Sequence, residues 1–162
     1  MGRIVAPPFD DPLFGALLAL NNDHAGELSY KTVEGFHALI AAASHVRAEA
    51  SGLALLVAFD DGCDYDNANF AWLKARFPRF YYIDRVVVSA AARGRGLARI
   101  LYDELEETAR GAARERLVCE INAVPPNPSS DAFHQRLGFS PVGMRQDAGS
   151  GKVVRYWAKT LA

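Results

Sequence analysis

Residues 86–98 read Val86-Val87-Val88-Ser89-Ala90-Ala91-Ala92-Arg93-Gly94-Arg95-Gly96-Leu97-Ala98. This stretch is the most informative part of the sequence, because it runs from a β-branched strand through a short loop into a glycine turn that opens a helix. A helix is predicted over residues 96–110, where apolar side chains recur at four-residue steps from Leu97 to Ala109. Backbone N–H groups at a helix start have no intrahelical partner, and the helix dipole adds partial positive charge there. The turn therefore suits a phosphate or pyrophosphate group.

Turn chemistry alone leaves two interpretations of this segment open. In one, the two glycines let the backbone approach an anion and the two arginines add charge. In the other, glycine serves only the geometry of a tight strand-to-helix connection. Two familiar phosphate motifs fit less well. Leu97-Ala98 stands where a P-loop needs Lys followed by Ser or Thr, and Arg99 stands where a dinucleotide fingerprint needs a third glycine.

Composition narrows the class of protein. The chain has 162 residues, half of them hydrophobic and 23% charged, so we expect one globular domain spanning residues 1–162. The formal net charge of -1 argues against nucleic acid as a partner. The longest apolar run, residues 53–59, is too short to span a membrane, and the N-terminus lacks the apolar core of a signal peptide. We therefore expect a cytoplasmic protein.

Cysteine and histidine usage suggests neither a disulfide framework nor a metal site. Cys63 and Cys119 are too few for a disulfide scaffold and have no metal-ligand spacing. The four histidines are scattered along the chain, so no metal is implied.

The rest of the chain predicts a mixed α/β layer. Apolar periodicity and turn residues predict strands at 3–6, 46–50, 53–59, 80–88, 117–122, 139–145 and 153–159. They predict helices starting near 10–12, and over 31–44, part of 67–77, 96–110 and 129–137.

These segments resemble the GNAT acetyltransferases. The pattern Arg93-x-x-Gly96-x-Ala98 and the helix after it look like the acetyl-CoA motif of that family. Downstream, Asn127, Ser130, His134 and Gly138-Phe139 resemble the family's Asn, small residue, Tyr and closing Gly-Phe at the same spacing. The resemblance implies a GNAT-like mixed central sheet of about seven strands flanked by about four helices. It also implies an acyl-CoA-dependent N-acetyltransferase that transfers acetyl directly in a ternary complex.

By that resemblance the cofactor is acetyl-CoA, and a run of named residues would hold it. The strand backbone would pair with the pantetheine arm, and N–H groups of the glycine turn would hold the pyrophosphate. Asn127 and the histidine downstream of it would contact the cofactor between the splayed strands 86–88 and 117–122. The implied cofactor-binding residues are Val86, Val87, Val88, Arg93, Gly94, Arg95, Gly96, Leu97, Ala98, Asn127 and His134.

Acetyl transfer to an amine needs a base for the amine, a donor to the oxyanion and a proton for the thiolate. His134 stands where the family commonly has a tyrosine that protonates the sulfur, and an imidazole can donate a proton near neutral pH. Asp84 is the preferred base, because strand alternation would put it on one face with Tyr82, Val86 and Val88. A salt bridge that merely fixes the strand is the alternative role for Asp84. Glu120 on the neighbouring strand is the rival base.

The acceptor site is the least family-like part of the chain. The polar cluster containing Asn22 and His24, together with Tyr82, is predicted to bind the acceptor, although a helix cap and a solvated turn explain that cluster as well. We expect a small-molecule amine, with a peptide N-terminal amine as the other possibility. The C-terminal hairpin also offers a surface for a homodimer. The alternative function is a non-catalytic module that binds or senses acyl-CoA.

Overall fold

The computed structural model describes residues 2–162, and within them the chain forms seven strands and five α-helices. The strands are β1 (Ile4–Val5), β2 (His45–Glu49), β3 (Ala54–Asp60), β4 (Phe80–Val88), β5 (Arg116–Val124), β6 (Ser140–Gln146) and β7 (Val153–Thr160). The helices are α1 (Asp11–Asp23), α2 (Val33–Ala42), α3 (Ala68–Lys74), α4 (Leu97–Gly111) and α5 (Pro128–Leu137). Every predicted strand and helix is present, and the helices number five where about four were expected.

Local capping explains where the helices begin. The Asp10 side chain accepts the Leu13 N–H at 2.9 Å and proline follows in the first turn of α1. Asn127 caps α5 in the same way, again with proline in the first turn. Helix α4 differs, because its N-cap is Gly96 in the left-handed conformation and no side chain caps it.

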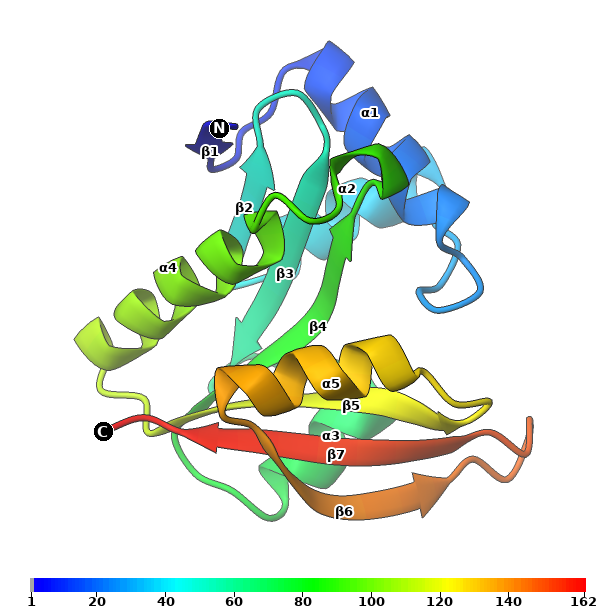
Figure 1. Cartoon of the computed structure of the whole chain (residues 1–162), viewed down its shortest axis with the longest axis vertical. Coiled ribbons are helices and arrows are strands. Elements are labelled where there is room, and N and C mark those ends of the chain that lie inside the picture. The colour runs from blue at the N-terminus through cyan, green and yellow to red at the C-terminus, as the bar shows by residue number, and fades with distance from the viewer. Residues whose placement is uncertain (1) are drawn as a thin grey trace.

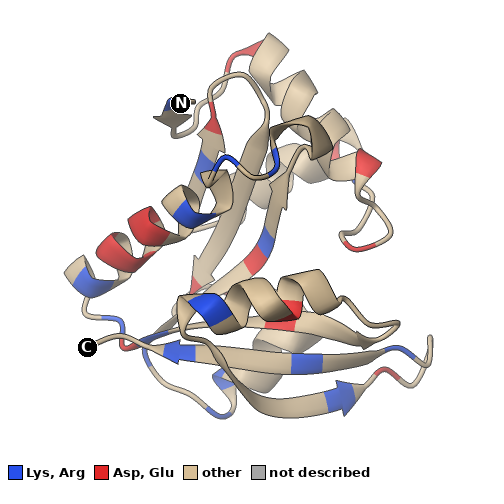
Figure 2. Cartoon of the chain, viewed as in Figure 1, with Lys and Arg blue, Asp and Glu red and all other residues tan. Residues whose placement is uncertain are grey.

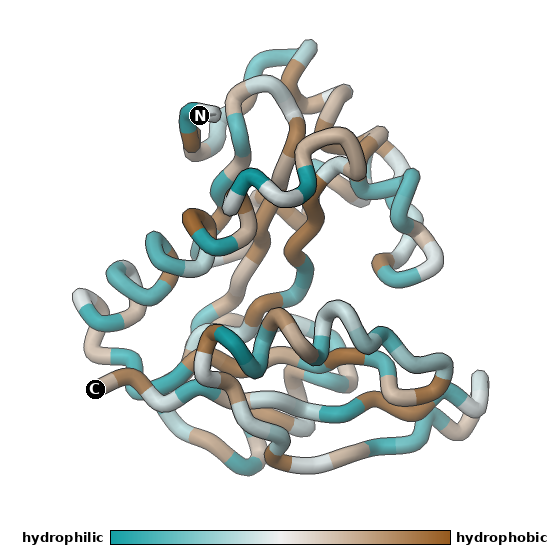
Figure 3. The backbone as a smooth tube through the Cα atoms, viewed as in Figure 1, coloured by the Kyte–Doolittle hydropathy of each residue, from teal (hydrophilic) through white to brown (hydrophobic). Residues whose placement is uncertain are grey.

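The strands form one mixed sheet in the order β1-β2-β3-β4-β5-β7-β6. Neighbouring strands are antiparallel except β4 and β5, which run parallel. Apolar side chains from α1, α2 and α3 pack on one face, and those from α4, α5 and Trp157 pack on the other. Figure 1 shows α4 and α5 on the near side of the sheet, and Figure 3 shows the hydrophobic residues concentrated along its central strands.

The two central strands separate soon after they meet. Parallel pairing of β4 with β5 runs from Phe80 opposite Arg116 to Tyr82 opposite Val118. Beyond that point β4 stays paired with β3 as far as Val88, while β5 follows β7. In Figure 1 the two strands open as a V with its mouth toward α1 and α5. This confirms the splayed pair that the family resemblance implied.

One expectation about β4 is wrong. Ile83 pairs with Ala58 while Arg85 pairs with Val57, so Asp84 is an extra residue in a β-bulge. The bulge reverses the alternation, and Val86 packs with Ile83 on the α4 side of the sheet, away from Tyr82. Strict alternation fails here because the sequence does not reveal which residue is left unpaired.

Candidate active site

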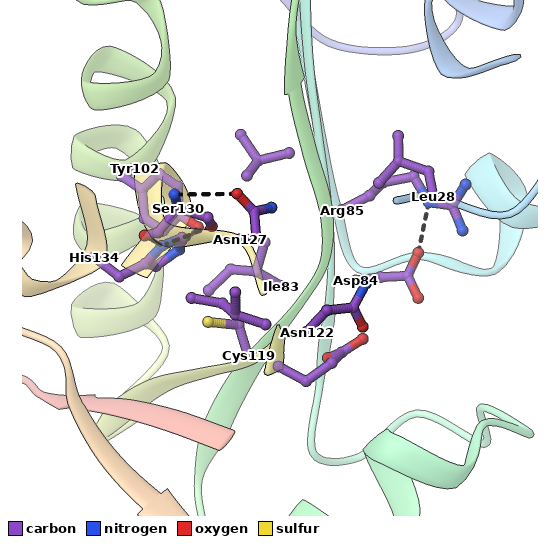
Figure 4. Close-up of a pocket in the computed structure, with 13 residues that line it drawn as sticks. Leu28, Ile83, Asp84, Arg85, Tyr102, Cys119, Asn122, Asn127, Ser130 and His134 are labelled. Carbon is purple, nitrogen blue, oxygen red and sulfur yellow. Dashed lines mark hydrogen bonds and ion pairs between the residues drawn. The ribbon is translucent and has the colours of Figure 1, made fainter. Parts of the chain in front are cut away.

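A pocket of about 110 Å³ crosses the sheet where β4 and β5 separate. Tyr102, Cys119 and His134 line it on the side of α4 and α5, and Asp84 and Glu120 line it on the side of α1 and α3. Figure 4 shows Tyr102, Ser130 and His134 grouped on one side of β4, with Asp84 and Arg85 on the other. The gap therefore has two carboxyl groups on one side of the sheet and a phenol, a thiol and an imidazole on the other.

The glycine turn lies at the near-side entrance to this gap. Gly94 has φ +80° and Gly96 has φ +75°, and a Cβ added at either would meet no atom within 4 Å. A hollow of about 320 Å³ lies against the turn and is bounded by Phe133 and Arg136 of α5. An adjoining hollow of about 410 Å³ follows Val86–Val88 to Asn127. An elongated phosphate-containing cofactor fits this arrangement. The uncapped start of α4 leads into the gap, and beside it lies the edge of β4 at Val86–Val88 that does not pair with β5.

His134 is buried and held at both ring nitrogens. Nδ1 lies 2.8 Å from the Ser130 carbonyl oxygen, and Nε2 lies 2.6 Å from the Tyr102 hydroxyl. A carbonyl oxygen can only accept, so Nδ1 carries the proton and Nε2 of the neutral ring accepts from Tyr102. Burial lowers the pKa of His134 below its ordinary 6.5. At neutral pH the ring therefore has no spare proton facing the pocket.

Asp84 is engaged in a buried ion pair. Its Oδ2 lies 2.7 Å from Nε of Arg85, and both side chains are about 95% buried. Its Oδ1 accepts the Tyr65 hydroxyl at 2.6 Å. Arg85 also donates to the buried Asn21 of α1 at 2.7 Å and to Ser29 at 3.3 Å. The strand-fixing role weighed for Asp84 is present, and it neutralises both charges beside the pocket.

Glu120 has a different environment, although it lies across the same gap. The Tyr82 hydroxyl contacts both its carboxylate oxygens, at 2.9 and 2.7 Å. Burial, and after it the Asp84 charge, raise the pKa of Glu120 from its ordinary 4.5 to about 8, although the hydrogen bond from Tyr82 opposes this rise. A carboxylate with this pKa can take a proton from an ammonium group near neutral pH.

The predicted acceptor residues are placed less uniformly. Asn22 donates to the Lys31 carbonyl oxygen at 3.0 Å and accepts its N–H at 2.9 Å, so it ties the end of α1 to the following loop. His24 contacts the Leu20 carbonyl oxygen through Nδ1 at 3.0 Å and lines the 410 Å³ hollow with Glu27. Tyr82 is fully buried beneath Glu120. Asn22 therefore fixes the loop after α1 rather than capping the helix, whose C-cap residue is His24, and His24 also faces a cavity.

Sequence reasoning missed several residues of the site, chiefly Tyr65, Asn69 and Tyr102. Tyr102 follows Leu101 on the buried side of α4, and it was missed because the apolar residues at four-residue steps were interpreted as core alone. Tyr65 and Asn69 belong to the irregular region before and within α3. A polar residue beside the apolar stripe of α4 was the one signal that could have identified Tyr102.

Comparison with known proteins agrees with this geometry. Residues 18–139 match the model of the acetyltransferase (GNAT) family. No curated protein sequence matches the chain.

Solved structures share the fold across the whole chain. The ribosomal-protein-alanine N-acetyltransferase of Brucella melitensis has 23% identity, with 98% of this chain and 99% of that chain covered and a TM-score of 0.72. An N-acetyltransferase of Staphylococcus aureus Mu50 has 18% identity, coverage of 100% and 99%, and a TM-score of 0.72. Ard1 of Thermoplasma volcanium has 13% identity, coverage of 99% and 98%, and a TM-score of 0.75.

Proposed function

The chain belongs to the GNAT acetyltransferase family, and we propose that it transfers acetyl from acetyl-CoA directly to the amine of a small molecule. Family membership makes it an acetyl-CoA-dependent N-acetyltransferase. The observation that carries the finer proposal is the gap between β4 and β5, which has an open glycine turn at one entrance and a carboxylate of raised pKa on the far side.

The near side of the gap is proposed to hold the cofactor. When bound, acetyl-CoA supplies an acetyl group activated as a thioester. Backbone N–H groups within Arg93–Ala98 would hold its phosphates, and Arg93 would add charge. Arg95, which the sequence also assigned to the cofactor, instead lines a separate hollow with Glu49 and Leu53. The β4 edge at Val86–Val88 would pair with its extended arm, beside Asn127. The left-handed glycines and the uncapped start of α4 support this assignment.

Glu120 is the proposed base. An amine arrives mostly as an ammonium ion, and the ionised Glu120 removes its proton so that the nitrogen lone pair becomes available. The pKa of about 8 suits this task, because the carboxylate is basic enough to accept the proton and is still partly ionised at neutral pH. Asp84 is assigned the positioning of Arg85, since their ion pair occupies its carboxylate.

His134 is proposed to contact the cofactor with Tyr102 rather than to donate a proton at neutral pH. Its Nε2 accepts from Tyr102 in the neutral ring, and burial disfavours the imidazolium that could donate. The family resemblance implied that His134 protonates the leaving sulfur in place of the usual tyrosine, and the present assignment gives His134 a binding role only. It predicts that thiolate departure does not depend on His134 ionisation.

A small-molecule acceptor is supported by the dimensions and charge of the site. The pocket at the reacting position measures about 110 Å³. Figure 2 shows both acidic and basic residues in each half of the molecule, and the net charge is -1. A single domain over residues 1–162, a cytoplasmic location and a homodimer stay predictions. In the described residues no helix is long and apolar enough to cross a membrane.

The test is release of free thiol from acetyl-CoA with a panel of small amines, and with peptides bearing a free N-terminus. Turnover with small amines that is lost in Glu120→Gln and kept in Glu107→Gln would support the proposal, because Glu107 is an exposed residue of α4. Turnover confined to peptides would refute the acceptor class. Full turnover in Glu120→Gln would refute the assigned base, and acetyl-CoA binding without turnover on any acceptor would favour the sensing module.

A further inference from the structure

The loop between α1 and α2, residues 24–32, forms part of the wall of the candidate site. Leu28 lines the 110 Å³ pocket beside Asp84 and Arg85, and Figure 4 shows these three side chains together on one side of β4. Among the described residues that line this pocket, Leu28 alone comes from before β4 in the chain. Glu27 of the same loop lines the adjoining 410 Å³ hollow. The position of the α1–α2 loop therefore helps to set the width of the pocket.

The hydrogen bonds of this loop are local, with one exception. Within the described part of the chain its other hydrogen bonds stay inside residues 20–36, as from the Leu28 N–H to the His24 carbonyl oxygen at 2.9 Å. The exception is the Ser29 hydroxyl, which lies 3.3 Å from Nη2 of Arg85 on β4. Arg85 is thus the point at which the loop is hydrogen-bonded to the sheet.

Asn21, near the end of α1, connects the loop to Arg85 a second time. Asn21 is completely buried, and its Oδ1 accepts from Nη1 of Arg85 at 2.7 Å. A guanidinium can only donate, so the atom facing Arg85 must be the amide oxygen, and the NH₂ group is free to bind elsewhere. Its Nδ2 donates to the Ser29 carbonyl oxygen at 3.0 Å. Ser29 is therefore tied to Arg85 directly through its side chain and indirectly through its backbone.

The bulge in β4 places Arg85 for this task. Neighbouring residues of a regular strand point to opposite faces, but the extra residue Asp84 lets its carboxylate meet the guanidinium of the next residue. Asp84 binds Nε of Arg85 at 2.7 Å and accepts the Tyr65 hydroxyl through its other oxygen at 2.6 Å. Nη1 and Nη2 remain for Asn21 and Ser29. A planar fork of donors serves these three partners at once, which the single ammonium of a lysine does not.

We propose that Arg85 is a positioning residue that docks the α1–α2 loop on β4, so that Leu28 closes one side of the pocket and limits the bulk of the acceptor amine. A bulky amine would have to displace Leu28 and break the bonds from Arg85 and Asn21 to Ser29. This inference rests on the proposed function, in which the pocket receives the acceptor beside Glu120.

Hydrogen–deuterium exchange of the full chain tests the docking without turnover. Asn21→Ala and Ser29→Ala remove contacts from the loop side and leave the buried ion pair of Arg85 in place. In Asn21→Ala we expect amides of residues 24–32 to exchange about tenfold faster, because a hydrogen bond to a charged group is lost. We expect a smaller rise in Ser29→Ala, whose contact is longer, and none in Ser140→Ala, at an exposed position of β6.

Ser29 is exposed, so its variant tests the docking even where Asn21→Ala does not fold. Loop exchange that matches the wild type in Ser29→Ala and in folded Asn21→Ala would overturn the inference.

Acceptor selectivity tests the role of Leu28. The readout is the ratio of kcat/KM for benzylamine to that for ethylamine, because a loss of folded enzyme lowers both values equally and leaves the ratio unchanged. We expect this ratio to rise about tenfold in Leu28→Ala, and to rise in Asn21→Ala as well, since the pocket loses one wall. Val33→Ala, which truncates a half-exposed apolar residue at the start of α2, should keep the wild-type ratio.

The two measurements separate this inference from the proposed function. A ratio that is unchanged in both Leu28→Ala and Asn21→Ala would overturn the assignment of Leu28 as a wall of the acceptor site. Faster loop exchange without turnover on any amine would support the docking by Arg85 and refute the proposed function instead.

Discussion

Replacement of Glu120 by glutamine is expected to stabilise the fold at high pH while removing activity. In the unfolded chain this carboxyl ionises near its ordinary pKa of 4.5, whereas burial raises its pKa to about 8 in the fold. Between these pH values the native state holds a proton that the unfolded state releases. Its contribution to stability is thus fully present below pH 4.5 and is lost as the pH rises through about 8.

The magnitude follows from the two pKa values. Each pH unit between them lowers the free energy of unfolding by about 1.4 kcal/mol, which reaches at most about 5 kcal/mol above pH 8. Glutamine has nearly the same shape and can still accept the Tyr82 hydroxyl, but it does not titrate. The stability of Glu120→Gln relative to the wild type should therefore rise with pH across this window.

The assay is urea unfolding of both proteins at pH 5, 6, 7 and 8, followed by circular dichroism. Comparing the two at each pH cancels the titration of all other groups, so the slope of the difference isolates Glu120. Glu107→Gln, at an exposed position of α4, should show no such slope. A stability difference that is constant with pH, or that grows toward acid, would refute the buried, raised-pKa environment.

Three further outcomes are expected elsewhere in the molecule. Acetyl-CoA should raise the thermal midpoint of the wild type by mass action, and Gly96→Glu should abolish that rise by placing a carboxylate in the phosphate turn. Gly96→Asn tolerates the left-handed backbone without added charge and should keep most of the rise, so equal loss in both variants would contradict the electrostatic explanation. Gly143→Ala should cost about 1–3 kcal/mol, seen as a Tm lower by about 2–4 °C per kcal/mol, because the new Cβ would overlap the Trp72 ring. In Gly149→Ala the new Cβ would lie 3.8 Å from its nearest neighbour, an ordinary contact distance, so Tm should not change. An equal fall in Tm in this variant would show that overlap with Trp72 is not the cause. His134→Ala should raise the KM for acetyl-CoA more than it lowers kcat. A loss confined to kcat, together with a wild-type kcat that changes with a pKa below 6.5, would instead make His134 the acid.

Much of the fold could be predicted from sequence because its signals are local. The strand predicted over residues 80–88 coincides with β4, and the helix predicted over 96–110 differs from α4 by one residue at each end. Both follow from periodicity and from glycine and proline chemistry within a few residues. The glycine turn and the downstream pattern ending at Gly138-Phe139 were enough to identify the family, because backbone contacts to a phosphate demand particular residues at fixed spacing.

The contacts and charges within the candidate site depend on the tertiary structure. The bulge at Asp84 depends on its pairing with β3, and it turned the favoured base toward an ion pair with Arg85. The pKa of Glu120 arises from burial and from Asp84 and Tyr82, which are distant from it in sequence. Charge and hydrogen bonding at a buried group depend on which side chains the fold brings within a few ångströms of it, and a single sequence does not reveal these distances.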